Sequence, residues 1–287
     1  MVLWQLVLYA LSAGMYYSLL SLGFGMTLRS IKFFNFSYGG AFLVGGYMAF
    51  LFYRVLEFPF LVSVLFALGA SGLYLVLAYK FIFSILLRRQ SRTLMSLIAS
   101  FGLLAATSAA LGMIFGNQIT LGARKLSDIY TVNVFGATLN LVQVVAILCF
   151  PIILAAFWYV RYKTRLGRSM RAVEDDMEVA ELVGISKEKT FLKIFFLSGV
   201  LAGLAGIAEV FDLGMTPASG LLIMLPTIVA TVIGGMPSFW GAVIGGFILA
   251  VSQQITVVFF GGSWVAAVPF VVLIIMLFIR PEGILKR

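Results

Sequence analysis

The chain has 287 residues, of which 62% are hydrophobic and only 11% are charged. Soluble domains contain about 25% charged residues, so this composition excludes an ordinary soluble globular protein. The formal net charge of +9 then indicates loops that face the cytoplasm, in preference to a nucleic-acid surface. The chain contains no histidine and a single cysteine, Cys149. An intrachain disulfide and histidine-based metal, base or proton-relay chemistry are therefore excluded.

Apolar runs of about 20 residues follow one another along the sequence, which predicts an all-α polytopic membrane protein. A transmembrane barrel would instead alternate over segments of about ten residues. We expect nine membrane-spanning segments, some of them short or broken, at residues 4–28, 37–56, 61–86, 94–115, 139–160, 190–210, 221–235, 240–259 and 265–280. The segment at 221–235 is short and interrupted by Pro226, so it either spans the membrane or is re-entrant, which would leave eight spans.

Lysine and arginine are distributed unevenly between the two sides of this arrangement. With the N-terminus outside, the loops inside contain Arg29, Lys32, Arg88, Arg89 and Arg92, the run from Arg161 to Lys193, and Arg280, Lys286 and Arg287. The loops outside contain only Arg54, Arg124 and Lys125. Because positive loops stay in the cytoplasm, this asymmetry predicts that the polar stretch at 161–189 is cytoplasmic. A re-entrant 221–235 would place the N-terminus inside instead.

Two breaks between apolar helices are candidates for the translocation pathway. The first contains Asn35, Ser37, Tyr38 and Gly39, and the second contains Gly234, Gly235 and Pro237. Non-helical backbone at membrane depth is tolerated where it is buried in protein or lines a cavity, as in the interrupted helices of transporters. For the first break, the alternative is an ordinary turn in which Asn35 or Ser37 caps the next helix.

Residues 165–206 form the longest stretch that departs from the apolar pattern, and its acidic part predicts a short helix. Asp175 followed by Glu178 matches an acidic capping box, and Gly184 stands where a helix commonly ends, so we expect a helix over Asp176 to Val183. An apolar stripe is formed by Met170, Val173, Met177 and Ala180. Such a helix fits a groove on a partner protein, or else packs on its own bundle.

Two further features lie on the predicted outer side. Glu209 and Asp212 end the span at 190–210, and acids near a membrane suggest a function. They would dock a soluble binding protein or line the mouth of the pathway, unless they are solvated loop residues. The extracytoplasmic connection at 116–138 is either a small subdomain or a plain long loop.

The sequence lacks the motifs of ATP binding and of several enzyme classes. It contains no GxxxxGK[ST], HExxH, GxSxG or CxxC motif. We therefore expect a transport subunit and not an enzyme. A self-powered proton-coupled carrier usually has ionisable groups within the bilayer, and the predicted spans contain almost none at mid-membrane depth. This favours transport driven by a separate motor protein.

Four segments, in this order, resemble the permease subunits of branched-chain amino acid ABC importers, the LivH-like family. They are NFSYGG, then GRSMRAVEDDMEVAELVGI followed by LSGVLAGLAGI, then VIGGMPSFWGAVIGGFILA, and finally RPEGIL. The resemblance covers nearly the whole chain. It departs from the family at Tyr38, where the family has histidine, at Gly40, where it often has an acid, and at the acids Glu209 and Asp212.

The resemblance implies one transmembrane permease domain over 1–287, with residues 161–189 as a cytoplasmic coupling segment. It implies ATP-driven import of branched-chain or other hydrophobic amino acids across a bacterial inner membrane by alternating access. The implied partners are two cytoplasmic ABC ATPases, a second permease subunit and an extracytoplasmic solute-binding protein. ATP and magnesium would be bound by the ATPases, and this chain would bind no cofactor.

The resemblance and the acidic cluster together define a set of expected ATPase-coupling residues: Gly167, Arg168, Arg171, Ala172, Glu174, Asp175, Glu178, Ala180, Gly184 and Ile185. The alternative function is a stand-alone carrier or channel for a small neutral solute such as urea or a short amide. A membrane-embedded enzyme or scaffold is a third possibility, which the missing catalytic motifs disfavour.

Overall fold

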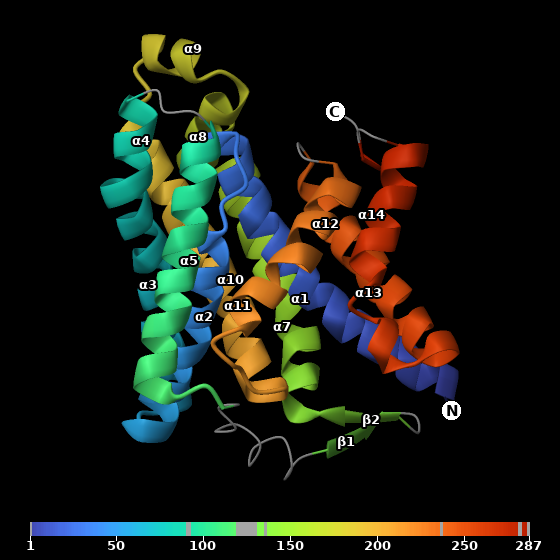
Figure 1. Cartoon of the computed structure of the whole chain (residues 1–287). Helices are drawn as coiled ribbons and strands as arrows, with labels where there is room; N and C mark the ends of the chain where they lie inside the picture. Colours follow the sequence, from blue (N-terminus) through green and yellow to red (C-terminus); the bar gives the residue numbers. More distant parts are fainter. Residues whose placement is uncertain are drawn as a thin grey trace.

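A computed structural model describes residues 2–89, 93–118, 131–134, 137–235, 238–280 and 283–285. Within these residues, six helices are long and apolar enough to cross a membrane, and two shorter apolar helical segments accompany them. The structure is thus the all-α polytopic membrane protein that the composition predicts (Figure 1).

The first half of the chain forms long helices, two of which continue through a π-helical turn. They are α1 (Val2–Ile31), α2 (Ser37–Phe50) with η1 (Leu51–Val55), α3 (Phe60–Ala78) with η2 (Tyr79–Phe83) and α4 (Ser84–Arg88), and α5 (Thr93–Phe115). Pro59 directly precedes α3, and its extended backbone starts a new helix after the turn. Most of the predicted connection at 116–138 lies outside the described residues, as do Arg92, Arg124 and Lys125.

The second half begins with an antiparallel hairpin of β1 (Thr131–Val134) and β2 (Ala137–Asn140), in which Thr131 pairs with Asn140. The helices that follow are α7 (Leu141–Lys163), α8 (Arg165–Asp175), α9 (Met177–Leu182), α10 (Lys187–Asp212), α11 (Ser219–Leu222), α12 (Met224–Gly234), α13 (Phe239–Phe260), η3 (Gly262–Trp264) and α14 (Val268–Ile279). Thr138 at the hairpin accepts hydrogen bonds from Gln5 and Tyr9 at 3.5 Å, which attaches the hairpin to α1.

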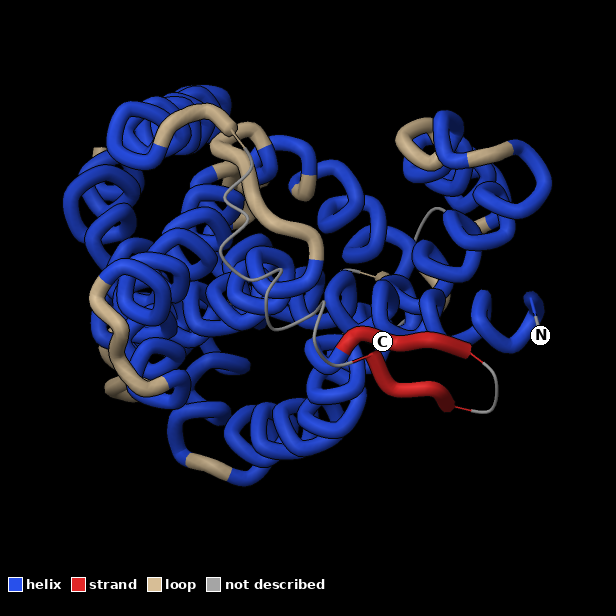
Figure 2. Tube along the Cα trace, turned by 90° about the horizontal axis from the view of Figure 1, so that it is seen from below, coloured by secondary structure: helices blue, strands red, loops and turns tan. Residues whose placement is uncertain are grey.

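The two ends of the molecule differ in what they carry. Helix α9 and the C-terminus lie at one end, which we call the coupling end (Figure 1). The hairpin and the N-terminus lie at the opposite end, the hairpin end, where the hairpin crosses the base of the bundle (Figure 2). The N-terminus and the coupling segment are therefore at opposite ends, as the charge asymmetry predicts.

Helix α10 packs closely against the first three helices through small residues. A Cβ atom at Gly45 of α2 would collide with Gly203 of α10, and one at Gly206 would collide with the Phe42 carbonyl. Ser71 Oγ in α3 donates to the backbone oxygens of Ala41 at 2.8 Å and Gly199 at 2.6 Å. These small residues thus allow the helix backbones to approach closely.

The short segment at 221–235 is broken, but not where the sequence predicts. Helix α11 ends at Leu222 and α12 begins at Met224, so the break falls at Ile223. Pro226 lies in the first turn of α12, where its missing N–H is not needed, so the prediction that Pro226 interrupts the helix is wrong. Helix α12 points toward the coupling end, where Ile284 donates to the Ile233 carbonyl at 2.9 Å.

Candidate functional site

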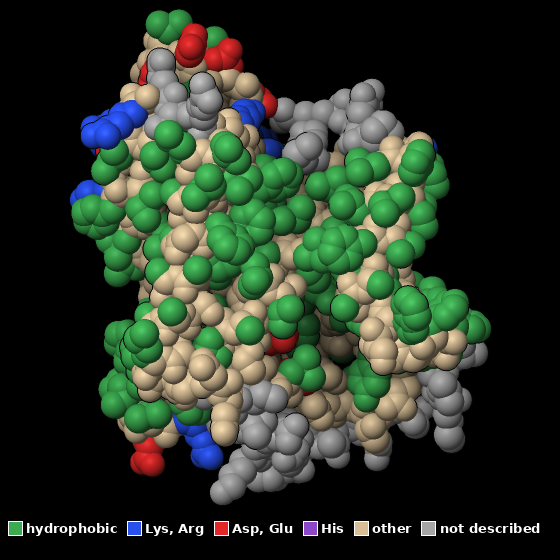
Figure 3. All heavy atoms as spheres, viewed as in Figure 1, with side chains coloured by type: hydrophobic (Ala, Val, Ile, Leu, Met, Phe, Trp, Pro, Cys, Tyr) green, Lys and Arg blue, Asp and Glu red, His purple; other side chains and the backbone are tan. Residues whose placement is uncertain are grey.

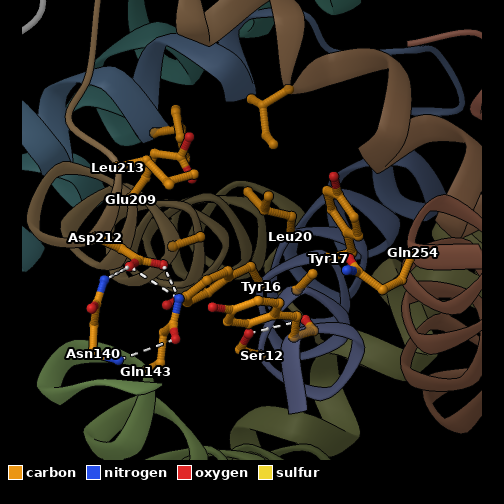
Figure 4. A pocket seen from close by; sticks show the side chains of 15 residues that line it. Ser12, Tyr16, Tyr17, Leu20, Asn140, Gln143, Glu209, Asp212, Leu213 and Gln254 are labelled. Carbon is orange, nitrogen blue, oxygen red and sulfur yellow. Dashed lines mark hydrogen bonds between the residues drawn. The ribbon is translucent and has the colours of Figure 1, made fainter. Parts of the chain in front are cut away.

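A cavity of about 490 Å³, which we call the polar cavity, lies between α1, α10, α13 and the β2–α7 junction. In the space-filling view, acidic atoms are visible inside a hollow of the face shown (Figure 3). The close-up shows polar side chains pointing toward one another from several elements (Figure 4). The described residues that line it are Tyr9, Ser12, Ala13, Tyr16, Tyr17, Leu20, Phe42, Asn140, Gln143, Ala205, Glu209, Asp212, Leu213, Ile223 and Gln254.

One polar stripe of α1 forms a wall of the polar cavity. Tyr9, Ser12 and Tyr16 are spaced three and four residues apart, which puts them on the same face of the helix. Ser12 Oγ donates to the Tyr9 carbonyl at 3.0 Å. Helix α1 therefore presents hydroxyl groups to the cavity while its other faces pack in the core.

Asp212 is held in place by two neutral amides. Asn140 Nδ2 donates to Oδ1 of Asp212 at 3.2 Å, and Gln143 Nε2 donates to both carboxylate oxygens at 3.2 and 3.3 Å. Asn140 and Gln143 also form the capping box that starts α7, in which Asn140 N donates to Gln143 Oε1 at 3.3 Å. The helix cap thus fixes the two amides that orient Asp212.

Glu209 lies one turn before Asp212 on α10 and also faces the polar cavity. No described residue donates a side-chain hydrogen bond to the Glu209 carboxylate or forms an ion pair with it. The described lining contains two carboxylates and no lysine or arginine. Buried carboxylates are stabilised by a cation or by hydrogen-bond donors, so this site suits a positively charged group on a solute.

The structure therefore places both acids of the predicted binding-protein docking site in a cavity and not on an open surface. Both residues line this cavity, and their expected roles, docking a binding protein or lining the mouth of a pathway, stay predictions. Neither residue is a solvated loop residue, since both belong to α10.

The first predicted pathway break lies elsewhere. The side chains of Asn35, Ser37 and Tyr38 are fully buried. Asn35 Oδ1 accepts from Ser37 N at 3.1 Å and Ser37 Oγ at 2.6 Å in a local turn. The N-cap of α2 is nevertheless Phe36, which makes no side-chain cap hydrogen bond, so the alternative in which Asn35 or Ser37 caps the helix is wrong. Tyr38 packs edge-on against Phe24, and Gly39 abuts the Gly220 carbonyl. The described lining of the polar cavity includes none of these four residues.

The second predicted break forms a tight turn at the coupling end. A Cβ at Gly234 would collide with the Gly241 carbonyl, so α12 and α13 come together at this glycine pair. Gly235 has a φ of +90°, a conformation that favours glycine, and it contacts Gly283 of the C-terminal segment. Neither Gly234 nor Gly235 belongs to the described cavity lining, and Pro237 lies outside the described residues.

The coupling segment contains a buried acid. The Glu174 carboxylate receives Arg161 Nη2 at 2.8 Å and Nη1 at 3.2 Å, and Arg29 Nε lies 3.8 Å away. Lys32 Nζ donates to the Glu174 carbonyl at 3.2 Å. Glu174 therefore connects α8 to α1 and α7, and its carboxylate does not form part of an exposed docking surface.

The capping prediction for α9 is wrong by one residue. Asp176, and not Asp175, is the N-cap, because its Oδ1 accepts from Glu178 N at 2.9 Å and Val179 N at 3.1 Å. Asp175 instead ends α8. The predicted end is confirmed: Gly184 has a φ of +83°, and Ile185 N donates to the Ala180 carbonyl at 3.0 Å in a Schellman motif.

The predicted apolar stripe faces the chain's own bundle. Met170, Val173 and Ala180 are buried and Met177 packs against the same core, so this stripe does not fit a partner's groove. Gly167 lies so close to α7 that a Cβ would collide with the Arg161 carbonyl, and Ala172 also packs on the core.

A different set of coupling-segment residues is exposed. Val179, Leu182 and Val183 are 53%, 85% and 70% exposed, and we call them the apolar tip of α9. Exposed acids surround this tip at Asp175, Asp176, Glu178 and Glu181. Arg168 is also exposed, while the Arg171 guanidinium lies 5.0 Å above the Tyr162 ring.

Most of the polar cavity is absent from the sequence-based predictions. Tyr9, Ser12 and Tyr16 carry a detectable signal, a polar stripe at helical spacing in an apolar span. Asn140 and Gln143 have the same three-residue spacing as Glu209 and Asp212. The two pairs meet because of the way α7 and α10 are arranged in space. The spacing of residues along the sequence does not specify that arrangement.

Comparisons with known proteins agree with this fold. Residues 6–277 match the family model described as branched-chain amino acid transport system / permease component. The chain is 26% identical to the high-affinity branched-chain amino acid transport system permease protein LivH of Salmonella typhimurium, over 96% of this chain and 92% of the relative. It is 30% identical to the probable branched-chain amino acid transport permease protein LivH of Methanocaldococcus jannaschii, over 93% and 87%.

Among solved structures, PsaBC from Streptococcus pneumoniae in complex with Fab has a TM-score of 0.54 and 15% identity, and the match covers 96% of this chain and 92% of that one. This likeness supports the fold alone. The family match covers almost the entire chain, and the described helices supply the membrane spans that such a protein requires. The chain therefore belongs to the family of branched-chain amino acid transport system permease components, the permeases of binding-protein-dependent ABC importers.

Proposed function

We propose that this chain is the transmembrane permease subunit of an importer driven by separate ABC ATPases. The observation that carries the proposal is the apolar tip of α9, with Leu182 85% exposed on a short, doubly capped helix. The tip and its acidic surroundings are a surface for a soluble partner with a complementary apolar and basic groove.

The tip is connected mechanically to the rest of the molecule. Helix α10 begins five residues after α9 ends and reaches Glu209 and Asp212 about 35 Å away, at a rise of about 1.5 Å per residue. The Glu174 ion pairs join α8 to α1 and α7 at the same end. A displacement of α9 would therefore move helices that line the polar cavity, which is the coupling that alternating access requires.

The proposed substrate is a branched-chain or other hydrophobic amino acid. Full-length relatives are named as branched-chain amino acid permeases, and the polar cavity has apolar lining residues beside its acids. The proposed partners are two ABC ATPases, a second permease subunit and an extracytoplasmic solute-binding protein. ATP and magnesium would be held by the ATPases, this chain would hold no cofactor, and the assembly would lie in a bacterial inner membrane.

Transport by the reconstituted importer tests this proposal. Proteoliposomes that contain the permease pair, its ATPases and the binding protein are expected to accumulate labelled leucine with ATP and not with a non-hydrolysable analogue. Leucine uptake that is equally fast without ATP would contradict the proposal. It would favour the stand-alone carrier or channel instead.

A further inference from the structure

We propose that the polar cavity binds the ammonium group of the transported solute, with Glu209 as the principal acceptor and Asp212 as the second. The permease itself would then select solutes that carry a protonated amine. This inference rests on the proposed transport function and adds the chemical class that the cavity accepts.

The two acids of the polar cavity have no ion-pair partner among the described residues. Glu209 and Asp212 are three residues apart on α10, which puts both carboxylates on the same face of the helix. The three ion pairs between described residues all involve Glu174 or Glu188, and none involves these two acids. A partly buried pair of carboxylates without a cation favours a cationic ligand in the cavity.

The two acids differ in their hydrogen-bond partners. Asp212 accepts from Asn140 and Gln143, so its position is fixed and part of its hydrogen-bonding capacity is used. Glu209 accepts no side-chain hydrogen bond from a described residue. An ammonium group has three donors and no acceptor, so both carboxylates offer it the kind of partner that it requires.

The remaining lining residues of the cavity also suit an aliphatic amine. Tyr16 and Tyr17 also line the cavity, with Tyr17 on the side of Gln254, and a tyrosine hydroxyl can accept a hydrogen bond from an ammonium group. Leu20, Phe42 and Ile223 give the cavity an apolar side, which suits the aliphatic body of a solute. At about 490 Å³ the cavity is within the usual range for small-molecule sites.

Other occupants fit this site less well. An anionic group would meet two carboxylates without a lysine or arginine in the described lining. A divalent metal usually has more protein ligands than two, and the described residues contain no group of three or more histidine, cysteine or acidic side chains. A neutral amide would leave both carboxylates without a counter-charge.

Four probes with the same branched skeleton separate these possibilities. They are leucine amide (a cation), leucine (a zwitterion), 4-methylpentanamide (neutral) and 4-methylpentanoate (an anion). Their affinities for the purified full-length permease in lipid nanodiscs can be measured by calorimetry, with sodium and magnesium chloride as further titrants. We expect leucine amide to bind most tightly, leucine next, the neutral amide at least about ten-fold more weakly than leucine amide, and the anion not at all.

Variants then assign the contacts. Glu209→Gln is expected to weaken leucine amide binding by about ten-fold or more, and Asp212→Asn by a similar or smaller factor. Glu57→Gln is the matched control, because Glu57 is exposed in the turn before α3 and lies outside the cavity. The unliganded melting temperature of each variant verifies folding. If neither cavity variant folds, the ranking of the four probes on the unmodified protein decides alone.

Equal affinity for leucine amide and 4-methylpentanamide would overturn the inference, as would no binding of any probe. Unchanged affinity in both cavity variants would overturn it too. Binding of sodium or magnesium as tight as that of leucine amide would replace the ammonium assignment with a metal-ion site. ATP-dependent leucine uptake tests the transport function separately, so the importer can be confirmed while this site is rejected.

Discussion

Arg161 and Glu174 form a two-point ion pair inside the molecule, with Nη1–Oε1 at 3.2 Å and Nη2–Oε2 at 2.8 Å. Their side chains are only 4% and 6% exposed. The pair joins the last turns of α7 to α8, and Arg29 adds the end of α1 at 3.8 Å. The coupling segment is thereby attached to two spanning helices by charge as well as by packing.

Removing this carboxylate should destabilise the protein. Glu174→Gln leaves Arg161 buried without its anion, which costs about 3 to 5 kcal/mol in comparable buried pairs. We expect a clearly lower unfolding temperature in detergent, together with lower expression. The matched control is Arg88→Gln, whose partner Glu188 forms an exposed pair with side chains 73% and 57% accessible. Exposed pairs contribute about 1 kcal/mol or less, so an equal loss in both variants would contradict this account.

The apolar tip of α9 should be needed for ATPase association and not for folding. Leu182→Asp places a charge at the most exposed tip residue, so we expect the ATPases to dissociate during purification while the melting temperature stays unchanged. Leu56→Asp is the control, since Leu56 is 47% exposed in the turn before α3. The turn that contains Leu56 lies at the hairpin end. The continuous helical segment after it, α3–η2–α4, ends at Arg88, which pairs with Glu188 at the start of α10, at the coupling end. Full ATPase retention in Leu182→Asp would contradict the docking role.

Close contact between α10 and α2 should depend on Gly206. A Cβ at this position would collide with the Phe42 carbonyl, so Gly206→Ala must separate the two helices. We expect a loss of about 1 to 3 kcal/mol, the usual range for overpacking, and a lower melting temperature in detergent. At Gly69 of α3 a Cβ meets nothing within 4 Å, so Gly69→Ala should be neutral or slightly stabilising. A Gly206→Ala variant as stable as Gly69→Ala would show that the helices are not in close contact.

Local signals predict the helices and their ends better than they predict the site. Gly184 was predictable because a positive φ at a helix end favours glycine. Asp175 and Asp176 are both suitable caps, and the choice between them depends on where α8 ends against the bundle. The burial of Glu174 depends on Arg29 and Arg161, which come from other helices. Likewise, Glu209 and Asp212 stand out in the sequence, but the amides that meet Asp212 come from the start of α7.

The function proposed for this permease depends on separate ATPases that dock on its coupling segment. Its most direct test is the protein composition of the complex purified from native membranes through a tag on this chain, measured by quantitative mass spectrometry. We expect two ATPase chains for each pair of permease chains, and their loss in Leu182→Asp. A permease that purifies without any ATPase and transports leucine on its own would contradict the claim.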